Sequence, residues 1–306
     1  MSGVAIQSLP ASTAQARPLA ARLNVPMHDI ALHRFPDGEI RVTAGPASPT
    51  TILYASLDQP NEKIVALLFA AEALRRNGAR RLVLVAPYLC YMRQDTAFHE
   101  GEAVSQTVIG KLLAATVDRV VTVDAHLHRT PDIASVFPGI EADNLSAMPA
   151  IADALKTAEL APDTIVVGPD SESRPWVSEL ASRLGVPHDV ASKTRRGDRS
   201  VDVRFSEPAL FAGRPVLLVD DIVSSGGTLV ACARALIDAG AAAIDAVIVH
   251  ALFPADMTRT LSAAGIRSIR STNSVPHPTN AIPLDGLLAS ALRNETRADR
   301  VVETRR

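Results

Sequence analysis

Three things are scarce in this chain of 306 residues, and each scarcity narrows the class of protein. It has two cysteines, Cys90 and Cys232, and neither has a metal-type spacing, so we expect a reduced, cytoplasmic protein, with a disulfide between the two left open. The formal charge is only -2, which predicts neither nucleic acid nor an acidic membrane as a partner. Apolar runs long enough to cross a bilayer are lacking, and the first residues do not read as a secretory signal.

What the chain does have is ample material for a core, since 47% of its residues are hydrophobic. Its length favours two domains. Apolar strand candidates alternate with helix candidates, as in strand 81–86 after helix 61–76, and this rhythm predicts an α/β fold with mostly parallel sheets flanked by helices. We place the boundary so that the domains are 1–145 and 146–306, with the option that the last helix, 284–294, packs back on the first domain.

The stretch from Val216 to Ala231 reads VLLVDDIVSSGGTLVA and is the most informative part of the chain. Its β-branched apolar start, 216–219, predicts a strand buried on both faces. Two acids follow, then a turn of small residues, then a predicted helix over 229–239. Backbone N–H groups at such a turn and the helix dipole together suit a phosphate. The turn consists of Ser224, Ser225, Gly226, Gly227 and Thr228.

The two acids in this stretch are Asp220 and Asp221. Carboxylates do not bind phosphate directly, but they suit the hydroxyl groups of a sugar or a metal ion. An ordinary strand-to-helix turn needs no acid pair at the end of a buried strand, because burial of uncompensated charge is costly. We therefore interpret the stretch as a site for a phosphorylated sugar, with a plain turn as the alternative.

A second candidate is the segment 33–39, HRFPDGE. Pro-Asp-Gly is turn chemistry, so a hairpin is predicted between short strands over 29–32 and 40–42. A purely structural hairpin does not explain an aromatic residue and two acids on one tip. Stacking of Phe35 on a purine, with hydrogen bonds to Asp37 and Glu39, would explain them, and chemistry alone leaves the two interpretations equally open.

Polar residues also follow two predicted strands, at the sheet edge where ligands of parallel sheets bind. Arg93, Gln94 and Asp95 come after strand 81–86, and an arginine suits a triphosphate while a glutamine suits an adenine edge. The alternative is a solvated loop.

The other group is Asp124 and His126, directly after strand 119–123. Residues two apart share one side of an extended chain, and a carboxylate with a neutral imidazole can bind a divalent ion or its waters. A histidine that only caps the strand end is the alternative. His128, two residues further on, receives no role.

The segment 192–199, SKTRRGDR, is basic and is expected to form a flexible loop. Lysine is rare in this chain and occurs only as Lys63, Lys111, Lys156 and Lys193. A lysine placed beside three arginines therefore suggests more than a solvated surface loop, although such a loop remains the alternative.

Taken together these motifs resemble the ribose-phosphate diphosphokinases, or PRPP synthetases, especially their archaeal-like branch. The matching stretches are RFPDGE, PYLCYMRQD, DAH, the Lys193 segment and DDIVSSGGT, and they occur in the family's order. The resemblance extends through at least Ser271 and implies two phosphoribosyltransferase-like domains.

The resemblance also implies a role for each motif. ATP would contact Phe35, Asp37, Glu39, Arg93, Gln94 and Asp95, and ribose 5-phosphate would bind Asp220, Asp221 and the turn 224–228. Lys193 and Arg195 would stabilise charge on the transferred diphosphoryl group. Mg²⁺ would be held through His126, Asp170 and Asp124.

The reaction implied is transfer of the β,γ-diphosphoryl group of ATP to the C1 hydroxyl of ribose 5-phosphate, giving PRPP and AMP. The hairpin would reach the ATP site of a neighbouring subunit, which implies a homo-oligomer, a dimer or a multiple of dimers. Two alternatives stay open: a phosphoribosyltransferase that consumes PRPP, and a non-catalytic regulatory homologue of the synthetases.

Overall fold

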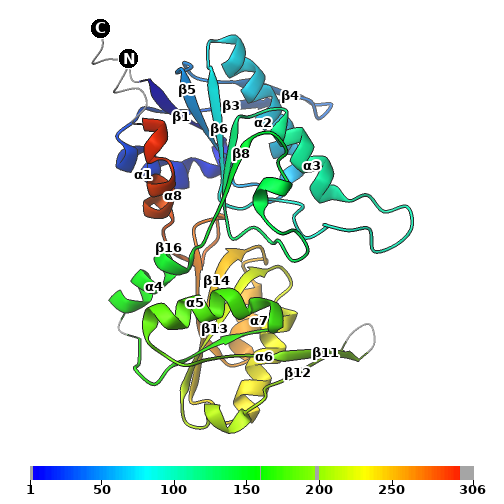
Figure 1. The fold of residues 1–306 in the computed structure, drawn as a ribbon, viewed down its shortest axis with the longest axis vertical. Helices are drawn as coiled ribbons and strands as arrows, with labels where there is room; N and C mark the ends of the chain where they lie inside the picture. The colour runs from blue at the N-terminus through cyan, green and yellow to red at the C-terminus, as the bar shows by residue number, and fades with distance from the viewer. Residues whose placement is uncertain (1–2, 159, 197–199, 297–306) are drawn as a thin grey trace. The chain divides into compact units, whose positions relative to one another are not determined.

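The computed structural model describes residues 3–158, 160–196 and 200–296. Its contacts divide the chain into two compact units (Figure 1). Unit 2 is Ser146–Pro283, and unit 1 consists of the described residues before Ser146 and those from Leu284 onward. Within these described ranges, every helix is too short or too polar to traverse a bilayer.

Unit 1 is built on a six-stranded parallel sheet in the order β2-β1-β5-β6-β7-β8. Its strands are β1 (Val4–Ser8), β2 (Met27–Asp29), β5 (Thr50–Tyr54), β6 (Arg81–Ala86), β7 (Arg119–Val123) and β8 (Glu141–Leu145). The helices are α1 (Thr13–Leu23), α2 (Pro60–Arg76), α3 (Ser105–Ala114) and α8 (Asp285–Ala291). A separate antiparallel hairpin joins β3 (Ala31–Arg34) to β4 (Ile40–Thr43).

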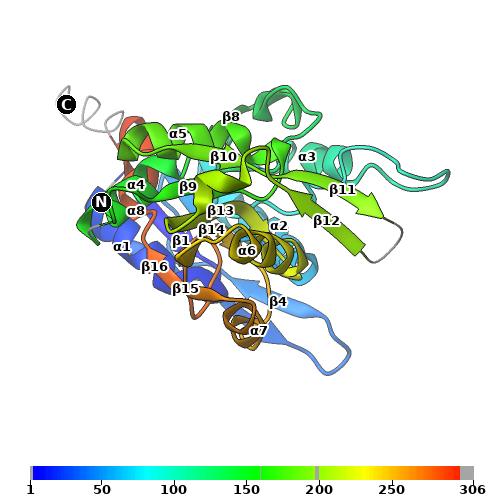
Figure 2. The same ribbon diagram turned by 90° about the horizontal axis from the view of Figure 1, so that it is seen from below.

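Unit 2 has the same plan, a six-stranded parallel sheet in the order β10-β9-β13-β14-β15-β16. Its strands are β9 (Ile165–Gly168), β10 (His188–Val190), β13 (Pro215–Val223), β14 (Ala243–Ala251), β15 (Ile266–Thr272) and β16 (Asn280–Ile282). The helices are α4 (Met148–Thr157), α5 (Arg174–Leu184), α6 (Gly227–Asp238) and α7 (Met257–Ala263). Its hairpin pairs β11 (Ser192–Arg196) with β12 (Ser200–Arg204) (Figure 2).

The prediction of parallel sheets flanked by helices is thus confirmed, and the repeated topology goes beyond it. In each sheet the second strand of the chain lies on one side of the first, and all later strands lie on its other side. The strand order therefore reverses between β1 and β5 and between β9 and β13. Parallel sheets bind ligands outside the carboxyl ends of strands at such a reversal. Each unit therefore has one place where its topology favours a site.

The core of unit 2 shows why these residues form strands. Ile165, Val216, Leu218, Ile244 and Ile266 are almost fully buried in one cluster with apolar residues of α6 and α7. Alternate strand residues face this cluster, and near-continuous apolar runs are typical of strands that are buried on both faces.

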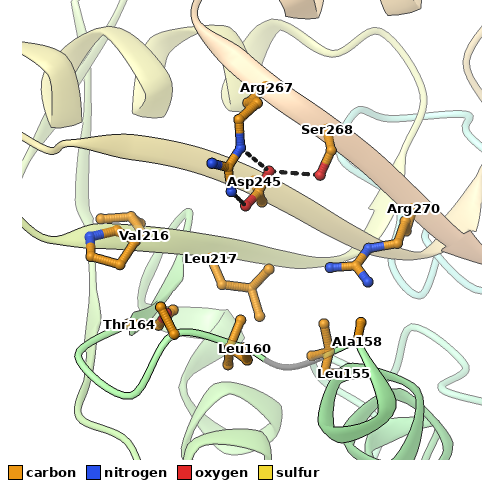
Figure 3. Close-up of a pocket in the computed structure, with 12 residues that line it drawn as sticks. Leu155, Ala158, Leu160, Thr164, Val216, Leu217, Asp245, Arg267, Ser268 and Arg270 are labelled. Atoms are coloured by element: carbon orange, nitrogen blue, oxygen red, sulfur yellow. Dashed lines mark hydrogen bonds and ion pairs between the residues drawn. The ribbon is translucent and has the colours of Figure 1, made fainter.

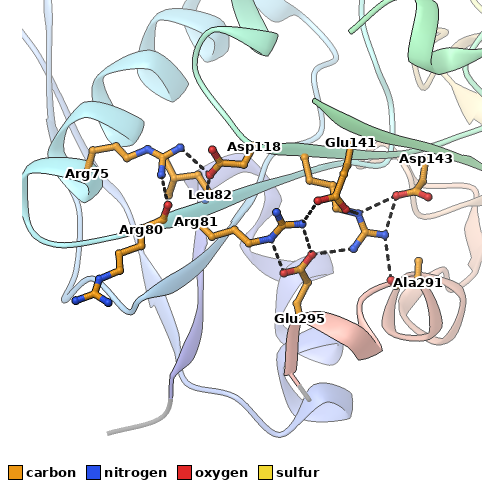
Figure 4. A network of polar contacts seen from close by, with 10 residues as sticks. Arg75, Arg80, Arg81, Leu82, Asp118, Glu141, Asp143, Ala291 and Glu295 are labelled. Carbon is orange, nitrogen blue, oxygen red and sulfur yellow. Dashed lines mark hydrogen bonds and ion pairs between the residues drawn. The ribbon is translucent and has the colours of Figure 1, made fainter. Parts of the chain in front are cut away.

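The final helix, α8, packs on α1 of unit 1, and a polar network holds the residues that follow it (Figure 4). Glu295, which is buried, accepts two hydrogen bonds from Arg81, both 2.8 Å, and one from Arg119 at 2.9 Å. Arg119 also pairs with Asp143 at 2.7 Å. Partial burial alone would raise the pKa of Glu295, but the two guanidinium groups outweigh it and the pKa lies below its usual range. The network fixes the end of the described chain to the amino ends of β6 and β7.

Candidate active site

The sheet reversal of unit 2 carries the turn that the sequence singles out. β13 runs into residues 224–226, and α6 begins at Gly227 with Gly226 as its N-cap residue. Gly226 has a φ of 71°, and a Cβ there would meet the Met257 Cγ atom at 3.3 Å. The position therefore favours glycine for its left-handed backbone, and α7 packs closely against it. The predicted strand, turn and helix are all present.

One prediction about this strand is wrong in extent. The strand was expected to end at Val219, but β13 continues to Val223, so Asp220 and Asp221 lie within it. The reason is its neighbour: β14 is equally long, and the parallel ladder pairs Asp220 with Ile248 and Val223 with Ala251. The acids consequently sit at the carboxyl end of a central strand. The predicted helix, too, begins earlier than expected, at Gly227 rather than at Leu229.

A third acid comes from β9, on the other side of the reversal. Asp170 follows this strand by two residues and accepts hydrogen bonds from the N–H groups of Glu172 and Ser173, at 3.1 and 3.3 Å. Asp220 accepts the N–H of Asp221 at 3.1 Å. Unit 2 thus brings its three predicted acids, Asp170, Asp220 and Asp221, together at the carboxyl ends of β9 and β13.

The three carboxylates repel one another. Loss of hydration is the main cause that raises the pKa of Asp220 well above its usual range, and the charges of Asp221 and Asp170 raise it further. Burial and nearby negative charges both disfavour the charged form of an acid. Sugar hydroxyl donors or a cation bound here would relieve this repulsion, so the donor set fits a polyhydroxyl ligand or a metal ion held by one or two carboxylates.

In unit 1, the predicted hairpin is confirmed as β3 and β4, and it presents the predicted aromatic residue. Phe35 is 38% exposed and packs edge-on against the His33 ring, with 4.7 Å between the centroids. The turn closes by hydrogen bonds from the Phe35 N–H to the Glu39 carbonyl and from the Glu39 N–H to the Asp37 carboxylate. Asp37 therefore shapes the tip, and the exposed ring leaves a face for stacking.

Next to the hairpin lies a cavity of about 550 Å³. It is lined by Gly38, Glu39 and Ile40 of the hairpin and by Glu62, Val65 and Phe69 of α2. Arg34 of β3 forms an ion pair with Glu62 at 2.6 Å, which ties the hairpin to α2. Val65 and Phe69 are 40% and 47% exposed, so the floor of this cavity is apolar.

The loop after β6 holds Arg93, Gln94 and Asp95, and the side chains of Gln94 and Asp95 contact the start of α3 and the loop after β7. The Gln94 side-chain oxygen accepts a hydrogen bond from the Ser105 hydroxyl at 2.8 Å, at the start of α3. Asp95 pairs with Arg129 at 2.9 Å and also accepts the Arg129 N–H. The loops that follow β6 and β7 are therefore linked to one another by side-chain contacts.

The loop after β7 holds Asp124 and His126, as predicted. Asp124 has a φ of 37°, an uncommon left-handed backbone for a residue other than glycine. The His126 ring contacts the His128 ring, with Nδ1 of the former 3.2 Å from Nε2 of the latter. His128, which received no role, is thus a direct neighbour of a predicted metal ligand.

Arg129 is the residue that sequence reasoning missed in this loop. Besides holding Asp95, its guanidinium lies 5.6 Å from the centre of the Phe98 ring. The signal available in the sequence was a basic residue in a loop directly after a parallel strand, next to the Asp124 and His126 pair. Without the fold, nothing connected it to Asp95, which lies 34 residues earlier.

The predicted metal ligands fall into both units: Asp124 and His126 in unit 1, and Asp170 in unit 2. Among the described residues no group of three or more His, Cys, Asp or Glu side chains is arranged to hold a metal ion. Because Mg²⁺ usually binds proteins through one or two carboxylates plus substrate phosphates, such a group is not required, and this ligand set stays a prediction.

Lys193 and Arg195 lie on β11, where the sequence favoured a loop. The antiparallel register pairs Lys193 with Val203 and Arg195 with Val201. The alternation of Val201, Val203 and Phe205 on the partner strand explains why this basic segment forms a hairpin, since such alternation is typical of a strand. The tip, 197–199, lies outside the described residues.

Two separate family models match this chain, one in each unit. Residues 4–116 match the model of the N-terminal domain of ribose phosphate pyrophosphokinase, and residues 143–271 match that of the phosphoribosyl transferase domain. The crystal structure of phosphoribosylpyrophosphate synthetase from Mycobacterium smegmatis superposes with a TM-score of 0.82 at 24% identity, covering 96% of this chain and 99% of that one. The fold and the matched domains thus define a two-domain protein of the phosphoribosyltransferase type.

Curated relatives make the assignment more specific. The ribose-phosphate pyrophosphokinase of Methanopyrus kandleri is 34% identical over 280 residues, covering 91% of this chain and 94% of the relative. Ribose-phosphate pyrophosphokinase 2 of Archaeoglobus fulgidus is 32% identical over 280 residues, covering 92% and 97%. The chain belongs to the ribose-phosphate pyrophosphokinase family, which confirms the predicted resemblance to its archaeal members.

Proposed function

We propose that the protein is a ribose-phosphate pyrophosphokinase that converts ATP and ribose 5-phosphate to AMP and PRPP. The observation that carries the proposal is the sheet edge of unit 2, where Asp170, Asp220 and Asp221 converge next to a small-residue turn that opens α6. Family membership adds the second substrate, because the relatives are named for this activity.

In the proposed complex the turn 224–228 binds the 5-phosphate through backbone N–H groups and hydroxyls. Asp220 and Asp221 accept hydrogen bonds from the ring hydroxyls, which removes the repulsion that raises the pKa of Asp220. The C1 hydroxyl oxygen attacks the β-phosphorus of ATP, the bond from that phosphorus to the α,β-bridging oxygen breaks, and AMP leaves. The chain offers Asp220 and Asp221 as acceptors for the hydroxyl proton.

ATP binds, in this proposal, with its base against Phe35 and within reach of Asp37, Glu39 and Gln94. Arg93, Lys193 and Arg195 add positive charge around the transferred group. Most of the rate enhancement then comes from positioning and electrostatic stabilisation, as in other phosphoryl transfers. Asp95 contributes by holding Arg129 in place.

Magnesium is proposed as the cofactor, held by Asp170, Asp124 and His126 together with the substrate phosphates. When bound, it neutralises phosphate oxygens during transfer. We further propose a cytoplasmic homo-oligomer, a dimer or a multiple of dimers, in which the hairpin β3–β4 completes a neighbouring ATP site. Exposed Phe35 and the apolar floor beside it support this, and both cysteines are free thiols, as in a reducing compartment.

The reaction is tested by phosphorus NMR of the purified protein with Mg-ATP and ribose 5-phosphate. Paired diphosphate signals of PRPP, appearing together with AMP, are expected. ADP in place of AMP would contradict diphosphoryl transfer. Unchanged ATP would favour the regulatory homologue, and turnover of added PRPP with a nucleobase would favour the phosphoribosyltransferase.

A further inference from the structure

Two polar side chains, one in each unit, differ in how completely the protein engages them. Asp245 lines a cavity of about 410 Å³ in unit 2 and accepts hydrogen bonds from Arg267 and Ser268 (Figure 3). Partial burial alone would raise the pKa of Asp245, but these bonds and the positive charges of Arg267 and Arg270 outweigh it, and the pKa lies below its usual range. Both carboxylate oxygens of Asp245 thus find their partners within the protein.

Gln94, in the loop after β6 of unit 1, is engaged at one end of its side chain only. Its side-chain oxygen Oε1 accepts the Ser105 hydroxyl at 2.8 Å, and its backbone carbonyl accepts the Gln106 N–H at 3.2 Å. The side-chain nitrogen Nε2 has no hydrogen-bond partner among the described residues, yet it is not buried. Its N–H groups are therefore available to a ligand.

The start of α3 determines which end of the Gln94 amide faces the protein. α3 begins at Ser105, and the first N–H groups of an α-helix lack partners within the helix and carry a partial positive charge. A carbonyl oxygen is favoured at such a place, whereas an amide NH2 group would be repelled. The Ser105 hydroxyl adds a direct donor to Oε1. The NH2 group of Gln94 consequently faces away from α3.

Further contacts hold the loop on both sides of Gln94. Before it, the Met92 carbonyl accepts a hydrogen bond at 3.4 Å from the side chain of Gln106, which is buried at the start of α3. After it, Asp95 pairs with Arg129 of the loop after β7 at 2.9 Å. With both neighbours anchored, the amide of Gln94 can change its orientation only by rotation of its own side chain, and the Ser105 hydroxyl opposes that rotation.

An amide in one fixed orientation discriminates between purine bases. Adenine presents an acceptor, N7, beside the donor amino group on C6, and a glutamine binds both at once. Nε2 donates to N7, and Oε1 uses its second lone pair to accept the amino group. Guanine has the same N7 but carries an oxygen on C6, so Oε1 of the fixed amide would face a second acceptor without a proton between them.

We propose that Ser105 is a positioning residue for nucleotide selection, because its hydroxyl fixes Gln94 in the orientation that pairs with adenine and opposes guanine. The inference rests on the proposed function and deepens it. It names adenine nucleotides as the preferred diphosphoryl donors, and it gives a role to a residue outside the predicted ATP contacts. Ser105 acts through Gln94 and not by touching the nucleotide.

The test is isothermal titration of the full-length protein with Mg-ATP and with Mg-GTP, without ribose 5-phosphate, so that binding is measured without turnover. Wild type should bind ATP about tenfold or more tightly than GTP, the scale of one bidentate base contact. Ser105→Ala should lower this ratio about fivefold, as expected for one lost hydrogen bond. Ser105→Thr keeps the hydroxyl and should preserve the ratio within about twofold.

A double variant separates an effect through Gln94 from a general effect on α3. In a Gln94→Ala background the hydroxyl has no amide to orient, so adding Ser105→Ala should leave the ratio of ATP to GTP affinity unchanged. Thr107→Ala removes an exposed hydroxyl from the same helix and should keep the wild-type ratio. A further fall of the ratio in the Gln94→Ala background would show that Ser105 does not act through Gln94.

The outcomes for this inference and for the proposed function are distinguishable. Binding of neither nucleotide by wild type would contradict the proposed function, and the inference would fall with it. Equal binding of ATP and GTP by wild type, or tight ATP binding with an unchanged ratio in Ser105→Ala, would overturn the role of Ser105 alone. Formation of PRPP in the phosphorus NMR experiment would still support the proposed function in either of these cases.

Discussion

Each unit has a turn at the same place in the repeated topology, and the two turns differ in the charged side chains around them. In unit 1, β5 leads through residues 55–59 into α2; in unit 2, β13 leads through 224–226 into α6. Both helices begin after an N-cap residue with a left-handed backbone, Gln59 with a φ of 48° and Gly226 with a φ of 71°. The backbone path is therefore shared, and the chemistry differs.

The unit 1 turn is closed by its own side chains. Lys63 donates to the Ser56 carbonyl at 3.0 Å and pairs with Asp58 at 2.7 Å, and the Ser56 N–H donates to the Ser12 hydroxyl across the sheet reversal. Beside the unit 2 turn lie three acids, Asp170, Asp220 and Asp221, in place of this ion pair. The same position in the fold thus serves stability where a lysine and an acid pair, and favours ligand binding where three acids lie close together.

The hairpins extend this comparison, because β3–β4 and β11–β12 also follow equivalent strands. Lys193→Ala, on the unit 2 hairpin, should lower kcat at least roughly a hundredfold, the scale for one lost transition-state charge contact. Steady-state kinetics of PRPP formation measures it. Lys156→Ala, an exposed lysine on α4, is the matched control and should keep wild-type turnover; near-normal turnover in Lys193→Ala would remove its assigned role.

A substitution in the unit 1 turn should change the free energy of unfolding rather than the rate of the reaction. Lys63→Met leaves Asp58 without its cation. The side chains of Lys63 and Asp58 are only 16% and 19% exposed, so water compensates the remaining charge poorly. We expect a loss of about 2 kcal/mol in the free energy of unfolding, less than for a fully buried pair, with kcat unchanged. Urea denaturation measures the loss.

A control for this variant lies on the same helix. Arg76 and Glu72 form an exposed pair, with side chains that are 68% and 64% exposed. Arg76→Met should therefore change stability by less than about 0.5 kcal/mol. Equal losses in Lys63→Met and Arg76→Met would show that the Lys63–Asp58 pair does not close the turn.

On the unit 1 hairpin, the effect should appear in substrate affinity. Phe35→Ala should raise the KM for ATP about tenfold, since stacking on an aromatic ring contributes roughly 1–3 kcal/mol per base. The KM for ribose 5-phosphate should stay the same. Phe35→Tyr keeps the ring and should behave as wild type, whereas unchanged ATP kinetics in Phe35→Ala would exclude stacking.

The smallest predicted effect is a gain in stability from Asp220→Asn. Because the folded state raises the pKa of Asp220, the destabilisation is absent below the usual carboxyl pKa, grows as the pH rises from there to the folded-state value, and is complete above it. Ligand-free Asp220→Asn should thus melt higher than wild type at pH 8 and equally at pH 3, with a gain near 1 kcal/mol or less. A lower melting temperature at pH 8 would contradict the repulsion.

Much of the fold followed from local pattern. The strands 81–86 and 119–123 are confirmed residue for residue, because apolar runs between turn signals leave little choice. β8 and β16 were not predicted, since Glu141–Leu145 and Asn280–Ile282 are short, polar edge strands that only sheet pairing reveals. The extension of β13 over two acids likewise depends on its neighbour β14.

The parts of the site that lie within one motif could be predicted from the sequence. The parts that depend on contacts between residues distant in sequence could not. The turn 224–228 could be placed from its small residues and the acids before it. The Asp95–Arg129 contact and the convergence of Asp170 with Asp220 depend on which strands are neighbours. A single sequence does not give that order, because loop contacts follow from topology rather than from composition.

The central claim is that the carboxylates of unit 2 bind a sugar, and the titration of Asp220 tests this claim most directly. Carboxyl carbon NMR, with Asp220→Asn to assign the signal, would follow the group with and without ribose 5-phosphate. We expect a pKa well above the usual range in the free protein and a fall when the sugar binds, because hydroxyl donors favour the charged form. An ordinary pKa in the free protein, or one that ribose 5-phosphate leaves unchanged, would contradict the account.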